Sequence, residues 1–309
     1  MKVVLAAEEA AGVQALRALA TSGHGVAAVL SSASVGEGRG ASVADVAANL
    51  GYDVLPARLV TSPDFAASVR AAGIDLLLNV HSLHIVHREV LAAPKIGAFN
   101  LHPGPLPSYA GLNAPSWAII RHERRHAVTV HWMAPGIDTG PTAYSAEFEI
   151  GDSDTGLSVS ARCVRLGVPL LLRLVEAAAR DPGAIPAVAQ DLTKRHYYGR
   201  AVPYGGRVCW SLPARELVAF VRAADFHPLR SPWGSPTARL GAMPIEIVSA
   251  SRTFVGCTTP PGTVGQPIDG AAAVAAGDEW VRVHRLRVGG ALVDPRDALH
   301  PGECLGEGG

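Results

Sequence analysis

The sequence predicts an α/β protein with a parallel sheet in its first half and a smaller β-barrel in its last part. Short β-rich runs alternate with helical patterns along the first half, as in doubly wound sheets, so this half is Rossmann-like. In the last part, several short strand-like runs with glycine or proline turns follow a helix, which is typical of a small barrel such as the OB type. A length of 309 residues suits two domains.

The elements of the first half can be taken in chain order from their hydrophobic patterns. The run VVLAA at 3–7 is apolar throughout, as in a strand buried on both faces. We then expect a helix ending at Gly23, a strand at 25–30, a helix near 42–50, a strand at 52–55, a helix near 62–72 and a strand at 74–80. Further on, 142–150 alternates like a strand, and 154–179 forms a long amphipathic helix.

The turn after the first strand reads AAEEAAG and lacks the GxGxxG pattern of dinucleotide-binding proteins. It places Glu8 and Glu9 where a pyrophosphate would bind. A helix start attracts anions, but carboxylates at this position would repel a phosphate. The sequence therefore speaks against an NAD- or FAD-binding role.

The domain boundaries follow from composition. The catalytic domain is expected at 1–189, and the polar, aromatic and glycine-rich run at 190–205 is expected to be a linker. The C-terminal domain then covers 206–309. It opens with the helix in SLPARELVAFVRAAD and continues with the strand-like runs MPIEIVSA, AAAVAAG and EWVRVHRLRV.

Composition and charge exclude several classes of protein. Hydrophobic residues make up 48% and charged residues 17%, enough for a globular core, and the 27 basic and 27 acidic residues give a net charge of +0. We therefore expect neither a nucleic-acid nor a membrane partner. The N-terminus has no signal-peptide pattern, which predicts a cytoplasmic protein. The cysteines show no CxxC spacing, so neither a zinc site nor a disulfide framework is expected at Cys163, Cys209, Cys257 and Cys304.

The most informative stretch is GAFNLHPGPLPSYAG at 97–111. A short apolar strand carries Asn100 and His102, which are two residues apart and so share one face. In open α/β sheets, ligands bind outside the carboxyl ends of the strands. A second strand ends in HWMAPGIDTGP, whose turn carries Asp138 among glycines and prolines. An amide, an imidazole and a carboxylate together suit acyl transfer.

With these residues in place, the chain resembles the folate-dependent formyltransferases, whose pattern is Asn-x-His at a strand end followed by a glycine-flanked Asp. Segment 79–119 resembles the core signature, 128–141 the second motif, and 206–223 the entry to the smaller C-terminal domain. The wording PLPSYAGLNAPSWAI looks closest to small-molecule N-formyltransferases of natural-product assembly. The resemblance implies 10-formyltetrahydrofolate as formyl donor, and no metal.

The resemblance also implies roles for individual residues. The side-chain NH₂ of Asn100 suits an oxyanion, His102 suits the removal of the amine's proton, and Asp138 would orient His102. The donor's pterin ring is expected beside the backbone of Ser82, Leu83 and Ile85, with Gly136 and Ile137 opposite. Residues expected to border the acceptor follow the catalytic loop: Tyr109, Asn113 and Ser116.

The predicted acceptor is the amine of a small biosynthetic intermediate, such as an amino acid or amino sugar, either free or carrier-bound. Two alternatives stay open: formylation of methionyl-tRNA, and a non-catalytic folate-binding relative. Against tRNA, the loop at 31–45 holds one arginine among acids, whereas a tRNA binder should present a basic stripe. Against a silent relative, all three catalytic residues are present. His81, His84 and His87 have a metal-like spacing but lack Cys or carboxylate company, so we expect loop histidines.

Overall fold

The computed structural model describes residues 1–32 and 41–308. The described residues form two compact units, each assembled from three segments. The first unit contains Met1–Ala114, Arg125–Glu149 and Ser160–Tyr198, and the second contains Pro115–Arg124, Ile150–Val159 and Gly199–Gly309. The arginine of the loop used in the tRNA argument, Arg39, lies outside the described residues.

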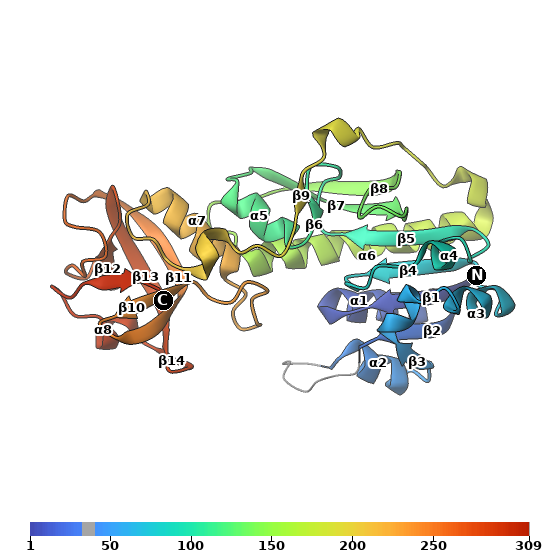
Figure 1. Cartoon of the computed structure of the whole chain (residues 1–309), viewed down its shortest axis with the longest axis horizontal. Helices are drawn as coiled ribbons and strands as arrows, with labels where there is room; N and C mark the ends of the chain where they lie inside the picture. The colour runs from blue at the N-terminus through green and yellow to red at the C-terminus, as the bar shows by residue number, and fades with distance from the viewer. Residues whose placement is uncertain (33–40, 309) are drawn as a thin grey trace. The chain divides into compact units, whose positions relative to one another are not determined.

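The first unit is built around a seven-stranded sheet with strand order β3-β2-β1-β4-β5-β7-β8 (Figure 1). The first five of these strands are parallel, and β7 and β8 are antiparallel to their neighbours. The order reverses between β1 and β4, and such a switch point is where ligands bind in open sheets. The strands are β1 (Lys2–Ala7), β2 (Gly25–Ser31), β3 (Val54–Pro56), β4 (Leu76–Val80), β5 (Gly97–His102), β7 (Arg125–Trp132) and β8 (Thr142–Glu149).

Alternate residues of the sheet feed two apolar cores. Val3 and Leu5 of β1 face a core that includes residues of α1, α2 and α6, whereas Val4 and Ala6 face a core that includes residues of α3 and α4. This division follows from the period of two along a strand. The helices are α1 (Glu9–Ala20), α2 (Val43–Asn49), α3 (Phe65–Ala71), α4 (Arg88–Leu91) and α6 (Gly156–Arg180), the last with its first turn in the second unit. Helix α5 (Ala114–Ile120) belongs to the second unit apart from Ala114.

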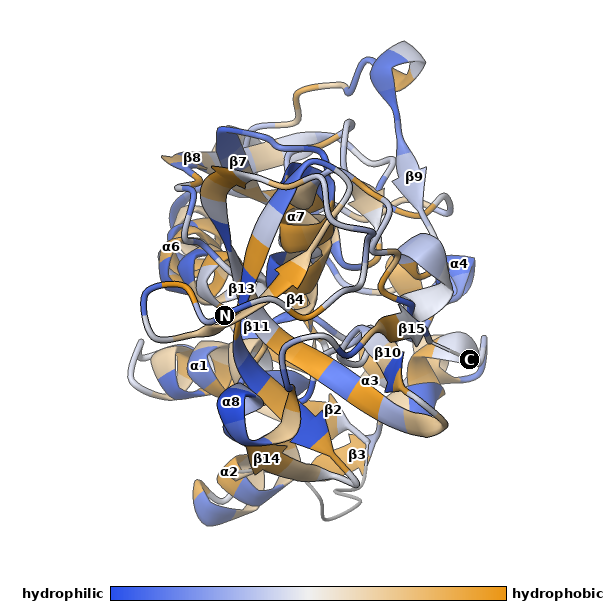
Figure 2. Ribbon diagram, turned by 90° about the vertical axis from the view of Figure 1, so that its left-hand side faces the viewer, coloured by the Kyte–Doolittle hydropathy of each residue, from blue (hydrophilic) through white to orange (hydrophobic). Residues whose placement is uncertain are grey.

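Helix α2 shows how local sequence sets a boundary. Ser42 accepts a hydrogen bond from the Asp45 backbone N–H, and the Asp45 carboxylate accepts one from the Ser42 N–H. Such a capping box satisfies donors that a helix start leaves free. In Figure 2, α2 carries both hydrophilic and hydrophobic colours, as expected for a helix with one buried side.

The second unit contains a curled antiparallel sheet with the order β12-β13-β11-β10-β15, with β14 paired to β13. Register shifts along β11 and β13 bend these strands, and Leu217 and Val221 of α7 belong to the core of the sheet. The elements are α7 (Ala214–Ala224), β10 (Thr237–Leu240), β11 (Met243–Gly256), β12 (Ala272–Ala275), β13 (Glu279–Val288), β14 (Ala291–Val293), α8 (Pro295–Ala298) and β15 (Leu305–Glu307). The predicted fold class, Rossmann-like with an OB-like C-terminal part, is confirmed.

A two-stranded pairing in the first unit has no counterpart in the sequence prediction. β6 (Ala110–Gly111) pairs in parallel with β9 (Tyr197–Tyr198), which belongs to the segment expected to be a linker. Short 3₁₀ helices occupy Ala57–Thr61, Pro182–Ala184, Leu192–Lys194 and Pro203–Gly206. None of the described helices combines the length and apolarity needed to cross a bilayer.

Candidate active site

The site is set by the register of three neighbouring strands. Asn100 of β5 pairs with Asn79 of β4 on one side and with His131 of β7 on the other. His102 follows at the end of β5, and its side chain is only 3% exposed. The amides of Asn79 and Asn100 and the imidazole of His131 therefore belong to neighbouring positions on three strands, near the carboxyl end of β5.

The side chain of Asn100 is held on both sides. Its Oδ1 accepts a hydrogen bond from Asn79 Nδ2 at 2.9 Å. Its Nδ2 lies 3.1 Å from His131 Nε2 and 3.4 Å from Asp138 Oδ1. The His131 Nδ1 donates to the Trp132 carbonyl at 2.8 Å, so its Nε2 is free to accept from Asn100 when the ring is neutral. The amide nitrogen of Asn100 thus faces Asp138.

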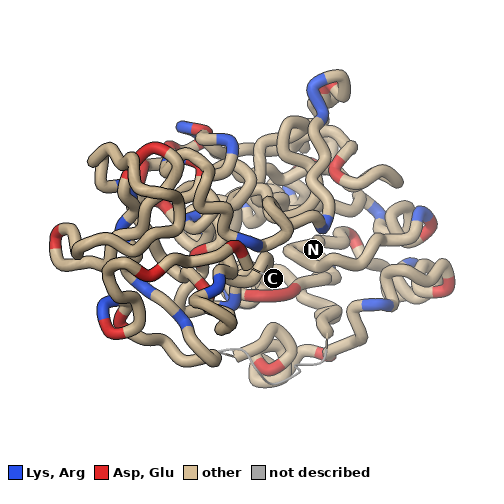
Figure 3. Tube along the Cα trace, turned by 60° about the vertical axis from the view of Figure 1, so that its left-hand side comes forward, with Lys and Arg blue, Asp and Glu red and all other residues tan. Residues whose placement is uncertain are grey.

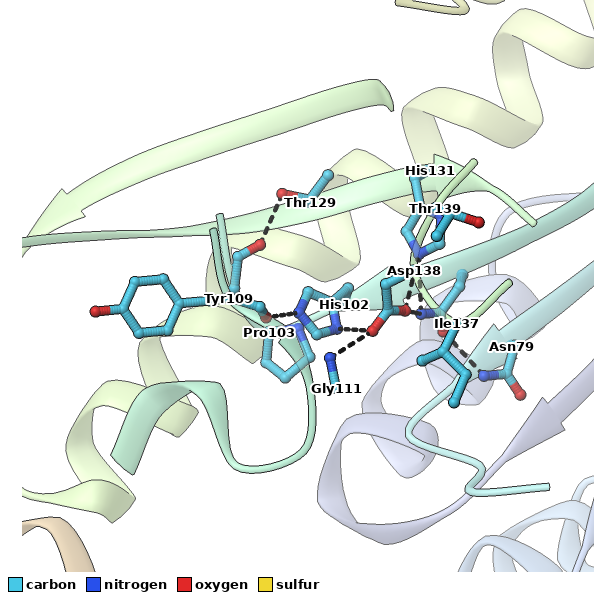
Figure 4. Close-up of polar contacts among 12 residues, drawn as sticks. Asn79, His102, Pro103, Tyr109, Gly111, Thr129, His131, Ile137, Asp138 and Thr139 are labelled. Atoms are coloured by element: carbon cyan, nitrogen blue, oxygen red, sulfur yellow. Dashed lines mark hydrogen bonds and ion pairs between the residues drawn. The ribbon is translucent and has the colours of Figure 1, made fainter. Parts of the chain in front are cut away.

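His102 lies between a backbone carbonyl and the Asp138 carboxylate, as Figure 4 shows. Its Nε2 donates to the Tyr109 carbonyl at 2.6 Å, and its Nδ1 lies 3.5 Å from Asp138 Oδ2. Burial lowers the pKa of His102, and the Asp138 carboxylate acts against that lowering. In the neutral ring the proton sits on Nε2, which leaves Nδ1 as the base. The Tyr109 carbonyl sets the tautomer, and the Asp138 carboxylate lies at the other ring nitrogen.

Asp138 occupies a turn in the left-handed region, with φ of +54°. Its Oδ2 accepts the Gly111 N–H at 2.8 Å, and its side chain is 9% exposed. Burial works against ionisation, but the neighbouring His102 and His131 and the Gly111 N–H together hold the pKa of Asp138 well below its ordinary value. Asp138 is therefore a carboxylate at neutral pH. It is placed to stabilise a protonated His102.

The segment that follows α6 holds the Asp138 turn from outside. Gln190 Nε2 donates to the carbonyls of Asp138 and Gly140, at 2.9 and 2.6 Å. Arg195 donates to the Ile137 carbonyl at 3.0 Å. Two residues after the arginine, β9 begins its pairing with β6, so one short segment contacts both loops that carry the site.

We expect Gly111→Ala to damage both stability and activity. Gly111 has φ of +95°, and a Cβ there would collide with the Tyr198 carbonyl oxygen. The substitution should lower the free energy of unfolding by about 1–3 kcal/mol or more and displace the N–H that holds Asp138. Denaturant unfolding and kcat measure the two effects. Gly23→Ala is the matched control, because Gly23 also has a positive φ but open space around it. Equal losses in both variants would contradict the collision.

The turn after His102 is fixed by two side chains of β7. His126 Nε2 donates to the Pro103 carbonyl at 2.9 Å, and Thr129 Oγ1 donates to the Gly104 carbonyl at 2.8 Å. Both side chains are 2% exposed. The backbone that follows the catalytic histidine is therefore held from within the sheet.

The burial of His126 predicts an acid-sensitive stability. Burial lowers the pKa of His126 from 6.5 to about 4. The unfolded chain therefore binds this proton first as the pH falls through that window, and the folded state loses up to about 3 kcal/mol. Urea unfolding of the wild type and of His126→Gln at about pH 7 and about pH 4 isolates this part of the pH dependence. The same acid-induced loss in both proteins would assign it to other groups.

The residues expected to bind the formyl donor lie on two turns of the first unit. Leu83 and Ile85 are 75% and 65% exposed, and Ile137 is 42% exposed. The hydroxyl of Ser82 is buried and has no hydrogen-bond partner among the described residues. Gly136 is exposed beside Ile137. Large apolar side chains left open to solvent beside a buried polar cluster are features of a ligand site.

The residues expected to border the acceptor belong to different units. Tyr109 is 6% exposed, its ring stacks on Tyr198, and it contributes its carbonyl to His102. Ser116 is 1% exposed and belongs to the second unit, where its hydroxyl donates to the Ala223 carbonyl. Burial leaves both side chains little surface for an acceptor. Asn113 is partly exposed in the first unit, just before α5, with φ of +56°.

A cavity of about 340 Å³ opens where β1 and β4 end, and it is lined by Glu8, Glu9, Ser32, His81, Leu83 and His84. Glu8 accepts hydrogen bonds from Ser31 and Ser32, and Glu9 lies 3.1 Å from His81 Nδ1. Across the described ranges, no three His, Cys, Asp or Glu side chains converge to hold a metal ion.

Sequence reasoning missed Asn79, His131 and Gln190 as members of the site. Asn79 had one detectable signal, a polar residue inside the otherwise apolar strand LLLNV. His131 lies within a strand pattern, where nothing local distinguishes it from a packed core histidine. Gln190 gave no local signal, because its contacts with the Asp138 turn span about fifty positions of the chain.

Comparison with known proteins finds formyltransferases. The family described as formyl transferase matches residues 1–175. The methionyl-tRNA formyltransferase of Xanthomonas axonopodis pv. citri (strain 306) is 32% identical, covering 97% of each chain, and that of Anaeromyxobacter dehalogenans (strain 2CP-1 / ATCC BAA-258) is 28% identical, covering 94% of this chain and 93% of that protein.

Two solved structures share the fold. The N-formyltransferase from Helicobacter canadensis, in complex with folinic acid and dTDP-3-aminofucose, superposes with a TM-score of 0.66 at 16% identity, covering 92% of this chain and 99% of that one. HypX from Aquifex aeolicus, in complex with tetrahydrofolic acid, superposes with a TM-score of 0.64 at 21% identity, covering 93% of this chain and 44% of that one.

Proposed function

The chain belongs to the formyl transferase family of enzymes, and on that premise we propose that it moves the formyl group of 10-formyltetrahydrofolate to the amine of a small biosynthetic intermediate. The observation that carries the proposal is the convergence of Asn100 and His102 on the Asp138 carboxylate. A hydrogen-bond donor, a base and a buried carboxylate are the groups that acyl transfer to an amine requires.

The reaction joins the amine nitrogen to the formyl carbon and breaks the bond between that carbon and N10, giving an N-formyl amine and tetrahydrofolate. Asn100 donates to the formyl oxygen as negative charge develops there, exchanging its long 3.4 Å contact with Asp138 for this bond. His102 Nδ1 takes the proton that the amine loses and returns it to N10. Asp138 stabilises the imidazolium in between.

The residues present fit a folate donor. The exposed side chains of Leu83, Ile85 and Ile137 offer apolar surface to the faces of a pterin ring. A buried polar atom without a partner among the described residues, Ser82 Oγ, offers an acceptor to one of its N–H groups. The folate compounds named for the Helicobacter and Aquifex proteins are consistent with this donor.

The cavity beside β1 favours a small amine as acceptor, either free or carrier-bound. Ala7 pairs with Val80 and Val80 with Leu101. The end of β1, where the cavity opens, is therefore two strand spacings, about 10 Å, from the end of β5, which carries His102. The carboxylates of Glu8 and Glu9 line this cavity. They attract a positively charged group of the acceptor other than the reacting amine, and they repel a phosphate.

Methionyl-tRNA is the second candidate acceptor, because the curated relatives with this activity match over nearly the whole chain. Charge speaks against it. Figure 3 shows basic and acidic residues scattered along the described trace, without a long run of basic ones. Nucleic-acid affinity depends mainly on neutralising phosphates.

A mass-spectrometric transfer assay tests the proposal. Purified protein and 10-formyltetrahydrofolate are incubated with a panel of amino acids and amino sugars, free and carrier-bound, and in parallel with methionyl-tRNA. We expect a small amine to gain the mass of one carbon monoxide unit. Formylation of the tRNA alone would overturn the proposed acceptor but keep the reaction. Transfer to nothing, with intact folate binding, would favour the non-catalytic relative.

A further inference from the structure

Asn79 is a buried amide in the middle of an apolar strand. It lies in β4, where its side chain is 6% exposed and its strand neighbours are buried apolar residues. Placing an amide there is costly unless it is hydrogen-bonded. Its Nδ2 donates to Asn100 Oδ1 at 2.9 Å and to the Ser82 carbonyl at 3.3 Å. Both bonds therefore involve residues of the proposed catalytic and donor-binding regions.

The orientation of the two amides follows from neighbours that have only one hydrogen-bonding role. The Ser82 carbonyl can only accept, so it requires the NH₂ of Asn79 on its side. At the other end, the Asp138 carboxylate can only accept, so it requires the NH₂ of Asn100. Each requirement on its own leads to Asn79 donating to the oxygen of Asn100, so the chain of hydrogen bonds is consistent from both ends.

His131 gives a third and independent constraint. Its Nδ1 donates to the Trp132 carbonyl, so in the neutral ring its Nε2 can only accept, and the group facing it across 3.1 Å is Asn100 Nδ2. A flipped Asn100 would turn its oxygen toward two acceptors, His131 Nε2 and Asp138. It would also set its NH₂ against the NH₂ of Asn79.

We propose that Asn79 is a positioning residue, which holds the amide of Asn100 with its NH₂ directed toward the reacting formyl group; this inference rests on the proposed function for Asn100. Asn79 anchors to the Ser82 carbonyl and fixes the oxygen end of Asn100. Without it, the Asn100 oxygen has no other donor among the described contacts, and only the contacts of its NH₂ with His131 and Asp138, at 3.1 and 3.4 Å, still hold the amide. Asn79 acts through Asn100 and not on the substrate.

A double-mutant cycle in kcat tests the inference. We expect Asn79→Leu to lower kcat by about 10-fold to 100-fold, the size that a small misplacement of a catalytic group produces, with little change in the donor KM. In the Asn100→Ala background the same substitution should change kcat less than about 3-fold, because the group it positions is gone. Equal effects in both backgrounds, or none in the wild type, would overturn the proposal.

Two further variants separate positioning from general damage. Asn79→Ala removes the same amide without adding a branched side chain, and it keeps the cycle usable where the leucine variant fails to fold. Thr253→Val removes a hydrogen bond from Thr253 Oγ1 to the Trp280 carbonyl within the second unit. We expect wild-type kcat from this control. A loss of kcat in the control comparable to that in the Asn79 variants would assign their effect to stability and overturn the proposal.

Nuclear magnetic resonance of the Asn100 side chain tests the inference even where no acceptor is found. The side-chain NH₂ signals of Asn100 in a ¹⁵N-labelled sample are assigned by their absence in Asn100→Ala. We expect Asn79→Leu to shift these signals and to speed their exchange with water. Unchanged signals would overturn the inference, whatever the transfer assay shows. Failure of transfer in the wild type with the expected spectral change would instead count only against the proposed function.

Discussion

His102→Ala is expected to lower kcat by about 100-fold to 10,000-fold, the range for loss of a general base. The reason is the position of Nδ1, which is the unprotonated nitrogen because Nε2 donates to the Tyr109 carbonyl. Without the imidazole, the amine must lose its proton to water. Steady-state rates with the acceptor found in the transfer assay measure the loss.

Binding of folinic acid, followed by calorimetry, should change little in the same variant, because the residues expected to hold the pterin lie on other loops. His24→Ala is the matched control, since His24 lies between α1 and β2, at the amino end of the second strand. A wild-type kcat in His102→Ala would remove His102 from the mechanism. A parallel loss of folate binding would indicate collapse of the site.

Asp138→Asn is expected to have an effect of similar size, because it removes a charge while keeping the shape. An Asp-to-Asn change beside a catalytic histidine costs about 10,000-fold in kcat where the aspartate also fixes the tautomer, so this figure is an upper bound here, where the Tyr109 carbonyl fixes it. In this protein the loss comes from the imidazolium of His102, which would face a neutral amide across the 3.5 Å gap. Asp152→Asn, in an exposed ion pair of the second unit, is the control for removal of a carboxylate.

The pH profile of Asp138→Asn separates this role from a structural one. In the wild type, kcat/KM should fall on the acid side as His102 becomes protonated, at a pH below the ordinary histidine range, because burial lowers its pKa. The Asp138 carboxylate opposes that lowering, so its removal should move the acid limb to still lower pH. An acid limb that stays in place or moves upward would show that the carboxylate does not act on His102.

The sequence was informative wherever the evidence was local. The spacing of Asn100 and His102 places both on one face of a strand, and the turn around Asp138 is recognisable from its glycines and prolines. The alternation of strands and helices likewise predicted the first sheet, because each element is defined by its own hydrophobic period. These inferences need no knowledge of which strands are neighbours.

The features of the site that could not be predicted from the sequence depend on the register of neighbouring strands and on burial. Asn79 and His131 reach Asn100 only because β4 and β7 flank β5 in a particular register, which no single strand encodes. The burial of Tyr109 and Ser116 is decided by packing partners distant in sequence, Tyr198 and Ala223. Nearness to the catalytic loop in the sequence therefore suggested a contact with substrate that their burial does not favour.

The way the chain alternates between its two compact units limits how the protein can be recombined. The second unit takes Pro115–Arg124 and Ile150–Val159 from the middle of the chain, and Arg222 of α7 donates to the carbonyls of Gly151 and Asp154. A chimera that exchanges only the residues after 205 with those of a relative would keep these two inner segments from the wrong parent. Exchange of the C-terminal part is therefore not a single-crossover operation, and a library built for altered specificity needs all three segments to come from one parent.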